Sequence, residues 1–387
     1  MTGHWLEWGL WITTGSLFFL SLWILIPAPL FSLLPLSVGV PELSPILWLI
    51  SWGVMGLVGL AIYTGYITGS GPFWVGLVAW GIFSIPLVML PSTIRHAADL
   101  LQPMASGSQP SLSIRYRLTG IPLPAIAPVR EEVFARPEGI PLTLRIYRPG
   151  DEAIHPGVLV IYGGAWQRGS SADNAQANQF LAGQGYTVIA LDYRHAPAYR
   201  FPAALQDVKR GWQYVQDHAV DLKVDVQRMA VMGRSAGGHL AMLLAYQTHP
   251  SPFRAVVNFY GPVDLARAYA HPPRPDPINT RAVLEAFLGG SPAVMPERYR
   301  QASPIHSVGS QKPPTLLIYG RRDHIVPPHY GRLLAQQLSD QGNSAFLVEI
   351  PWADHAFDAV FSGLSSQLAL ETTRYFLSST LVVNYPS

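Results

Sequence analysis

The sequence predicts an α/β protein in which a mostly parallel sheet, covered by helices on both faces, is preceded by about three transmembrane helices. Three observations carry this prediction. Apolar strand-like segments alternate with helical segments from about residue 128 onward. A Gly-x-Ser-x-Gly motif at 233–237 stands between a short buried strand and a helix. Three long apolar runs, each free of charged side chains, occupy much of the first 94 residues.

Composition narrows the class of protein. The chain has 387 residues, which is long enough for one large domain and a further region. Hydrophobic residues make up 49% and charged residues only 13%, which is more apolar than an ordinary soluble protein. The formal net charge of +2, without a basic cluster, argues against nucleic acid as a partner. The lack of cysteine excludes disulfides, cysteine-based zinc sites and a cysteine nucleophile.

The N-terminal region, residues 1–97, is expected to lie in a membrane. Its apolar runs at 10–26, 46–67 and 73–90 are close to the roughly 20 residues that cross a bilayer core. Tryptophans lie near the ends of these runs, where interfacial aromatic side chains are expected. The alternative is a buried helical cap on a soluble protein. A cleaved signal peptide fits less well, because no Lys or Arg precedes the first run.

The first Lys or Arg in the chain sets the expected orientation. It is Arg95, which directly follows the third run. The positive-inside rule then places the N-terminus outside and the large domain in the cytoplasm. A channel or transporter has little support, because the runs carry no charged group and Glu42 lies between two of them.

The remaining elements follow in order. Residues 98–127 are rich in Pro, Ser and Gly and are expected to form a linker, so the α/β domain is expected over 128–380. A hairpin turning at Pro137-Glu138-Gly139 opens that domain. Strands are expected at 157–162, 187–191, 229–232, 255–259, 315–319 and 345–350, and helices at 172–185, 202–218, 330–341 and from Phe357 onward. Residues 266–308 break the alternation, which predicts a small cap with a helix at 281–288, N-capped by Thr280.

Ser235, in the Gly-x-Ser-x-Gly motif, is the candidate nucleophile. The flanking glycines allow a sharp strand-to-helix turn that lifts the hydroxyl above the sheet edge. A serine hydroxyl is a poor nucleophile at neutral pH, so it needs a base, a group that holds the base, and donors for an oxyanion. The sequence offers a candidate for each at the end of a predicted strand, where ligands collect in open α/β sheets.

The candidate base is His355, which follows the last predicted strand and opens the last predicted helix. The candidate acid is Asp323, in the turn after the strand at 315–319. A carboxylate there can accept the imidazole N–H and hold its tautomer, and the order Ser, Asp, His along the chain suits this arrangement. The rival bases are His239, His324 and His329, and the rival acids are Asp264, Asp354 and Asp358.

The oxyanion donors are expected from the loop after the first long parallel strand, Tyr162-Gly163-Gly164-Ala165-Trp166. Its two glycines let backbone N–H groups turn into the site, and Gly164 and Ala165 are the candidate donors. Ala236, directly after the serine, is a third candidate. Trp166 is expected to line the substrate pocket.

Together, these residues and their order along the chain resemble those of a known protein family. From about residue 128 to residue 377 the chain resembles the α/β-hydrolase superfamily, and within it the bacterial carboxylesterase branch that includes the BD-FAE group and is related to hormone-sensitive lipase. The resemblance is carried by the stretches at 162–166, 192–197, 201–207, 233–240, 260–261, 320–327 and 355–357. Arg234 stands before the serine where many lipase-like relatives carry Asp, which favours the BD-FAE side. Tyr162 replaces a His of the family's oxyanion loop, and Ala165 replaces its third Gly.

The resemblance implies an α/β-hydrolase fold and a serine hydrolase, with a carboxylesterase as the first expectation. The N-terminal apolar runs, which have no counterpart in the usual soluble members of the family, add the expectation of a membrane anchor. Ser235, Asp323 and His355 would cleave a small-molecule or lipid ester through an acyl-enzyme, with no metal and no organic cofactor. The bacterial plasma membrane is the expected location. Plant prenylcysteine methylesterases offer an analogy, because they combine such a domain with membrane segments. An amidase, a peptidase or a lipase would use the same triad, and a non-catalytic binding module is the alternative from another class.

Overall fold

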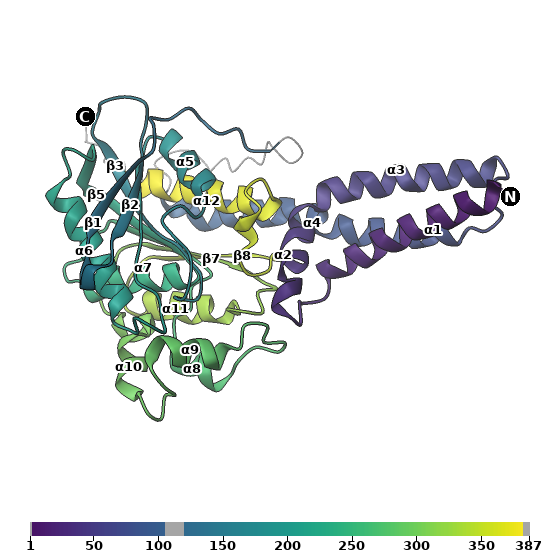
Figure 1. Ribbon diagram of the computed structural model, residues 1–387. Helices are drawn as coiled ribbons and strands as arrows, with labels where there is room; N and C mark the ends of the chain where they lie inside the picture. Colours follow the sequence, from purple (N-terminus) through teal and green to yellow (C-terminus); the bar gives the residue numbers. More distant parts are fainter. Residues whose placement is uncertain (1, 105–119, 382–387) are drawn as a thin grey trace.

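The computed structural model describes residues 2–104 and 120–381. Figure 1 shows two parts, an α/β domain and a bundle of long helices that projects from it. The bundle consists of α1 (Thr2–Ser21), α3 (Ser44–Tyr63) and the first half of α4 (Gly71–Leu101), which pack against one another. Short 3₁₀ turns and helix α2 (Leu34–Glu42) join α1 to α3 at the base of the bundle.

Two helical segments of the described residues are long and apolar enough to cross a membrane, Ser44–Tyr63 and Gly71–Met104. The expectation of three spans is therefore corrected to two candidates. The first apolar run, 10–26, lies in α1 and the 3₁₀ turn that follows it. Helix α1 also contains Glu7, Thr13 and Thr14, which lower its mean hydropathy.

Helix α4 connects the bundle to the core of the α/β domain. Its 31 residues extend for about 46 Å without a break, at about 1.5 Å per residue. Phe83 is buried among the helices of the bundle, whereas Leu90, Ala97 and Leu101 are buried in the core of the α/β domain. The helix also contacts the last strand and the last helix of that domain. Residues 98–101, expected in a linker, are thus the last turn of α4.

The α/β domain is built on one eight-stranded sheet in the order β1-β2-β4-β3-β5-β6-β7-β8. The β1–β2 and β2–β4 pairs are antiparallel, and every other neighbouring pair is parallel. The strands are β1 (Arg130–Ala135), β2 (Leu142–Tyr147), β3 (His155–Ile161), β4 (Thr187–Leu191), β5 (Val224–Arg234), β6 (Ala255–Phe259), β7 (Thr315–Gly320) and β8 (Ala345–Ile350). The predicted hairpin and the six predicted strands are confirmed to within a few residues, except that β5 begins earlier than predicted.

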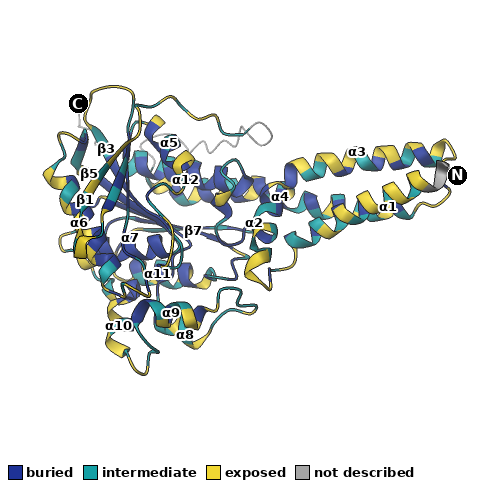
Figure 2. Ribbon diagram, in the orientation of Figure 1, coloured by how far each residue is buried: buried dark blue, intermediate teal, exposed yellow. Residues whose placement is uncertain are grey.

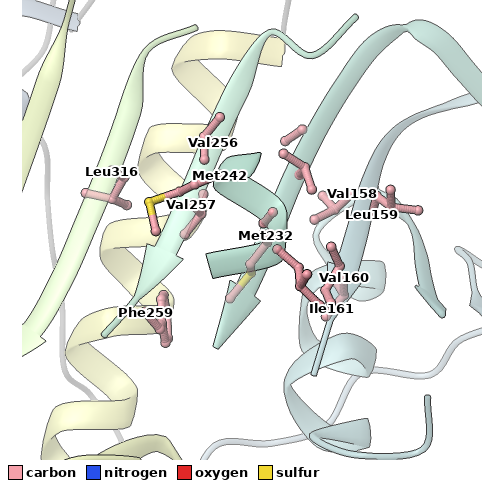
Figure 3. Packing of buried hydrophobic residues seen from close by; sticks show 14 of the residues in the cluster. Val158, Leu159, Val160, Ile161, Met232, Met242, Val256, Val257, Phe259 and Leu316 are labelled. Atoms are coloured by element: carbon pink, nitrogen blue, oxygen red, sulfur yellow. The ribbon is translucent and has the colours of Figure 1, made fainter. Parts of the chain in front are cut away.

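Helices cover both faces of the sheet and account for its apolar strands. They are α5 (Ala175–Gly183), α6 (Ala203–Asp217), α7 (Ala236–Gln247), α11 (His329–Asp340) and α12 (Leu364–Leu381). Figure 2 shows the central strands buried beneath them. Figure 3 shows the core between them, where Val160 of β3, Val257 of β6 and Met242 of α7 belong to one cluster of buried residues. A strand buried on both faces needs a continuous apolar run, which these segments have.

Two local predictions need correction. The last helix begins at Leu364 rather than at Phe357, which lies in a short 3₁₀ turn (Phe357–Ala359) after the positive φ of Ala356. In the cap, formed by α8 (Leu265–Ala270), α9 (Thr280–Leu288) and α10 (Pro296–Gln301), the N-cap of α9 is Asn279. Asn279 has a φ of 53°, which Asn tolerates, and its side chain accepts the N–H of Ala282. Thr280 is instead the first residue of that helix.

Glu42, at the end of α2, joins the base of the bundle to the last helix of the α/β domain. Its carboxylate Oε2 accepts the backbone N–H of Ser365 at 2.7 Å, in the first turn of α12. A side chain at Gly363 would collide with this carboxylate, so glycine leaves the room it needs. Burial raises the pKa of Glu42 to about 8, against the hydrogen bonds from the first turn of α12, which lower it. An acid from the bundle therefore caps α12.

This raised pKa predicts a pH dependence of stability. The unfolded chain releases the Glu42 proton near the ordinary pKa of about 4.3, whereas the folded chain keeps it to about 8. Between these values the folded state binds more protons, so its stability falls as pH rises, by up to about 1.4 kcal/mol per pH unit. We expect the melting temperature of Glu42→Gln, measured in detergent from pH 5 to 9, to fall less than that of the unsubstituted chain.

The matched control is Glu131→Gln, which changes an exposed carboxylate on β1 and should leave the pH profile unchanged. A Glu42→Gln profile parallel to that of the unsubstituted chain would contradict the account of Glu42.

Candidate active site

The turn that carries Ser235 has the geometry that its glycines predict. Ser235 has φ 51° and ψ −120°, a backbone conformation that residues other than glycine rarely adopt. A Cβ at Gly233 would collide with the carbonyl of Gly237, and a Cβ at Gly237 would collide with the carbonyl of Ile161. The turn thus packs tightly between β5 and α7. It places the hydroxyl next to the N-terminus of α7, where the first N–H groups have no partner within the helix.

A chain of hydrogen bonds links Ser235, His355 and Asp323. The His355 Nε2 lies 3.0 Å from the Ser235 Oγ, and its Nδ1 lies 2.8 Å from the Asp323 Oδ2. Asp323 follows β7 and His355 follows β8, so two adjacent parallel strands bring the acid and the base together. The structure thus assembles the three residues that the sequence analysis selected.

Asp323 is also fixed by its own turn. Its Oδ1 accepts the backbone N–H groups of Ile325 at 2.9 Å and Val326 at 2.7 Å. Burial raises the pKa of the Asp323 carboxyl, and the charge and hydrogen bond of His355 oppose that shift. One carboxylate oxygen is therefore held by the backbone while the other faces the imidazole. This arrangement favours a single orientation of the ring.

The rival histidines have other partners. His239 is fully buried and accepts a hydrogen bond from the Trp166 indole at its Nδ1, at 3.2 Å. Its Nε2 faces the Ala302 carbonyl, and burial lowers its pKa to about 4. His324 pairs with Asp354 at 2.8 Å, and the ring of His329 packs on Tyr330.

The rival acids are also engaged elsewhere. Asp264 accepts the N–H of Arg267 and caps α8. Asp354 contacts His355 only through the backbone N–H of that residue, at 2.7 Å. Its carboxylate also binds His324, as just described. Asp358 belongs to a separate buried network, and none of the three contacts the His355 ring by a hydrogen bond among the described residues.

That network lies beneath the base and was missed from the sequence. The Asp358 carboxylate accepts hydrogen bonds from the Arg234 guanidinium and the Tyr260 hydroxyl. All three side chains are buried. The Tyr260 ring packs on the His355 imidazole with 4.6 Å between centroids. Arg234 was noted beside the serine, but its partner is more than a hundred positions away, and no local pattern indicates it.

The loop after β3 approaches the serine with free backbone donors. Gly164, Ala165 and Trp166 have φ values of 118°, 55° and 60°, so the chain turns sharply here. A Cβ at Gly163 would lie 3.3 Å from the Ser235 Cβ, which shows how closely the loop passes. Among the described residues, the N–H groups of Gly164 and Ala165 donate no hydrogen bond. These two N–H groups and that of Ala236 are available for an oxyanion.

Tyr162, at the start of this loop, takes part in packing. Its ring stacks on Tyr193 with 4.4 Å between centroids, and its hydroxyl lies 2.9 Å from the His195 Nε2. Burial raises the pKa of the Tyr162 hydroxyl well above its ordinary value. The side chain therefore anchors the base of the loop as a neutral phenol.

Two cavities meet at Ser235. The larger, of about 420 Å³, is lined by Ser235, His355 and the loop at 163–169, together with Phe31, Leu34 and Val38. The smaller, of about 50 Å³, is lined by Ser235, Ala165, Ala236, Trp166 and residues of the cap. Trp166, predicted to line a substrate pocket, lines this smaller cavity together with Ser235. The contribution of Phe31, Leu34 and Val38 was missed, because these residues precede the α/β domain and only the tertiary fold brings them to it.

The described residues contain no group of three or more His, Asp or Glu side chains arranged to hold a metal ion. The arrangement instead has the parts of a nucleophilic site. It combines a half-buried serine hydroxyl that lines a cavity, a base held by a carboxylate, and free N–H donors.

Comparison with known proteins gives a consistent picture. A family model described as BD-FAE matches residues 144–338. The "Probable carboxylic ester hydrolase LipM" of Mycobacterium tuberculosis (strain ATCC 25618 / H37Rv) is 30% identical over 234 residues, which cover 57% of this chain and 53% of that protein. The "Ethyl acetate hydrolase" of Pseudomonas putida is 32% identical over 236 residues, which cover 57% of this chain and 72% of that protein. The chain spans about half the length of the first of these relatives.

Solved structures of two esterases have a fold similar to that of this chain. The esterase Est2 of Thermogutta terrifontis is 27% identical, with a TM-score of 0.54, and the match covers 65% of this chain and 92% of that one. An esterase of Pyrobaculum calidifontis has a TM-score of 0.60, and the match covers 77% of this chain and 94% of that one. Its sequence identity is 24%, so this second likeness concerns the fold alone.

Proposed function

The chain belongs to the BD-FAE family of α/β-hydrolases, and on that premise we propose that it is a carboxylic ester hydrolase with Ser235 as its nucleophile. The observation that carries the proposal is the hydrogen-bonded chain from Asp323 through His355 to Ser235, beside free backbone N–H groups. The relatives named as an ester hydrolase and an ethyl acetate hydrolase favour esters as substrates.

The geometry fits a two-step mechanism. Ser235 Oγ attacks the ester carbonyl carbon while His355 Nε2 takes the hydroxyl proton. Asp323 accepts the Nδ1–H and stabilises the imidazolium. The N–H groups of Gly164, Ala165 and Ala236 receive the oxyanion of the tetrahedral intermediate. His355 then gives its proton to the leaving alcohol, and an acyl-enzyme remains. A water molecule, deprotonated by His355, attacks this acyl-enzyme, and His355 then returns the proton to Ser235 Oγ as the acid leaves.

The bundle is proposed to anchor the enzyme in a membrane. Large apolar side chains are exposed on its outside, and only 17% of the most apolar stretch of α3 is buried. Figure 2 shows exposed residues along both α1 and α3. A buried cap on a soluble protein would have most of that surface covered. The exposed side chains include Trp8, Trp11, Ile12, Phe19, Leu49, Ile50, Trp52, Leu57, Leu60, Trp74, Val78 and Val88. So large an exposed apolar surface favours contact with lipid. Arg95 then favours a cytoplasmic active site, and a bacterial plasma membrane remains part of this proposal.

Covalent labelling tests both parts of the proposal. Membrane fractions carrying the chain, the Ser235→Ala variant or the Ser291→Ala variant are treated with a fluorophosphonate probe, which reacts with activated serines. We expect the label in the membrane pellet for the chain and for Ser291→Ala, and none for Ser235→Ala. Ser291 follows α9 in the cap and lines neither of the cavities at Ser235, so it controls for the substitution itself.

Each other result has a definite meaning. A folded chain that takes no label would contradict the enzyme proposal and favour the binding-module alternative. A label that persists in Ser235→Ala would assign the nucleophile to another serine. A labelled chain that stays in the soluble fraction would contradict the membrane anchor.

A further inference from the structure

We propose that the segment at 28–42, between the first two helices of the bundle, forms a wall of the leaving-group pocket, so that the preferred substrates are short-chain acyl esters of large apolar alcohols taken from the membrane. The inference rests on the proposed ester hydrolysis and names the substrate class of that same site. It is carried by the two cavities at Ser235 and by the contacts of this segment.

The position of the base distinguishes the two cavities. His355 must give its proton to the leaving alcohol, so the alcohol has to leave on the side of the serine that His355 lines. Only the larger cavity is lined by His355. Oxyanion donors line both cavities, Gly164 and Ala165 the larger, and Ala165 and Ala236 the smaller. The smaller cavity, which His355 does not line, is therefore left for the acyl group.

The volumes of the two cavities then set the sizes of the acyl group and the alcohol group of the ester. A cavity of about 50 Å³ holds about three to five water-sized groups, at about 10–15 Å³ each, which corresponds to an acyl chain of about two to four carbons. Its walls are rigid, because Trp166 is buried and stacks on Phe287 of the cap with 4.2 Å between centroids. The larger cavity, of about 420 Å³, admits a much longer group.

The wall formed by Phe31, Leu34 and Val38 is held in place on the α/β domain. The Arg168 guanidinium stacks over the Phe31 ring at 4.7 Å, which ties this segment to the loop that carries the oxyanion donors. Ala28 is fully buried at one end of the segment, and Glu42 caps α12 at the other. This wall is therefore part of the site.

The same segment opens toward the membrane. It lies where the bundle meets the α/β domain (Figure 1) and is separated from α1 only by the short 3₁₀ turn Leu22–Ile24 and residues 25–27. Leu25, Ile26 and Leu30 are about half exposed beside the wall residue Phe31. An apolar alcohol in the bilayer can thus reach the larger cavity along an apolar surface.

A pair of isomeric esters tests the assignment of the acyl group to the smaller cavity and of the alcohol to the larger one. Octyl acetate and ethyl octanoate have the same formula and similar partitioning into lipid, but they exchange the long group between the alcohol and the acid. The full chain is reconstituted in vesicles of ether-linked phosphatidylcholine, which contain no carboxylic ester. We expect kcat/KM for octyl acetate to exceed that for ethyl octanoate by at least about tenfold. The octanoyl chain overfills the smaller cavity, whereas the octyl group has room in the larger one.

Val38→Trp tests the wall. The added ring fills part of the larger cavity, so the ratio of kcat/KM for octyl acetate to that for ethyl acetate should fall by about tenfold or more. The control is Val220→Trp, the same change at an exposed position outside both cavities, which should leave the ratio unchanged.

The outcomes separate this inference from the proposed function. Ethyl octanoate hydrolysed as fast as octyl acetate, in a reaction that Ser235→Ala abolishes, would overturn the substrate class and leave the esterase intact. A preference for octyl acetate that Val38→Trp does not change would overturn the role of the wall. A folded chain that hydrolyses none of the three esters would remove the proposed function itself.

Discussion

Replacement of Asp323 by asparagine is expected to lower kcat for a small ester by about 10⁴-fold while the protein stays folded. The Asp323 Oδ2 accepts the Nδ1–H of His355, which leaves the Nε2 lone pair free to take the Ser235 proton. An asparagine amide has the same shape, but it can donate to Nδ1 and favour the tautomer with the proton on Nε2. That tautomer cannot act as the base. Steady-state hydrolysis of ethyl acetate measures the loss.

Asp354→Asn is the matched control for this prediction. Asp354 is equally buried and directly precedes His355, but it binds the His355 backbone N–H rather than the ring. Its replacement weakens hydrogen bonds worth about 1 kcal/mol each, so a loss of about tenfold is expected. If Asp354→Asn reduced kcat as strongly as Asp323→Asn, the assignment of the acid to Asp323 would be wrong.

Replacement of Arg234 by methionine is expected to reduce the free energy of unfolding by about 3–5 kcal/mol. Arg234 and Asp358 form a buried ion pair, and both side chains are 4% exposed. Methionine fills a similar volume but leaves the Asp358 charge in the interior without its counter-charge. For a domain of this size the melting temperature in detergent should fall by on the order of 10 °C.

A second variant distinguishes the lost charge from the lost packing. The triple variant Arg234→Met, Asp358→Leu, Tyr260→Phe contains no buried charge at this place and no hydroxyl left without its acceptor, so it should recover most of the stability that the single variant loses. Arg300→Met, which breaks an exposed ion pair with Glu297, should cost less than about 1 kcal/mol. A cost for Arg234→Met no larger than that of Arg300→Met would contradict the importance of the buried pair.

Local patterns in the sequence were sufficient to place the sheet and to select the residues of the candidate site. Buried strands are continuous apolar runs, and Ser235, Asp323 and His355 each follow such a run. Parallel strands end at the same edge of the sheet, so residues after β5, β7 and β8 meet there whatever their distance along the chain. The glycines around Ser235 added the conformation of the turn.

Contacts between distant segments could not be predicted in this way. Glu42 caps α12, Phe31 stacks under Arg168, and Arg234 pairs with Asp358. Each contact joins residues whose own surroundings in the sequence show no sign of the partner. The start of α12 was misplaced for the same reason, because its N-terminus is capped by a residue from the bundle rather than by its own preceding residues.

Because helix α4 runs unbroken from the bundle into the α/β domain, neither part can readily be separated from the other and joined to a different protein. A fragment that began at residue 120 would remove Leu90, Ala97 and Leu101 from the core of the α/β domain and would leave β8 and α12 with uncovered apolar faces. It would also remove Glu42 from the first turn of α12. Recombination that joined this α/β domain to a different anchor would therefore have to supply a replacement for the second half of α4, and the two parts are expected to be inherited together.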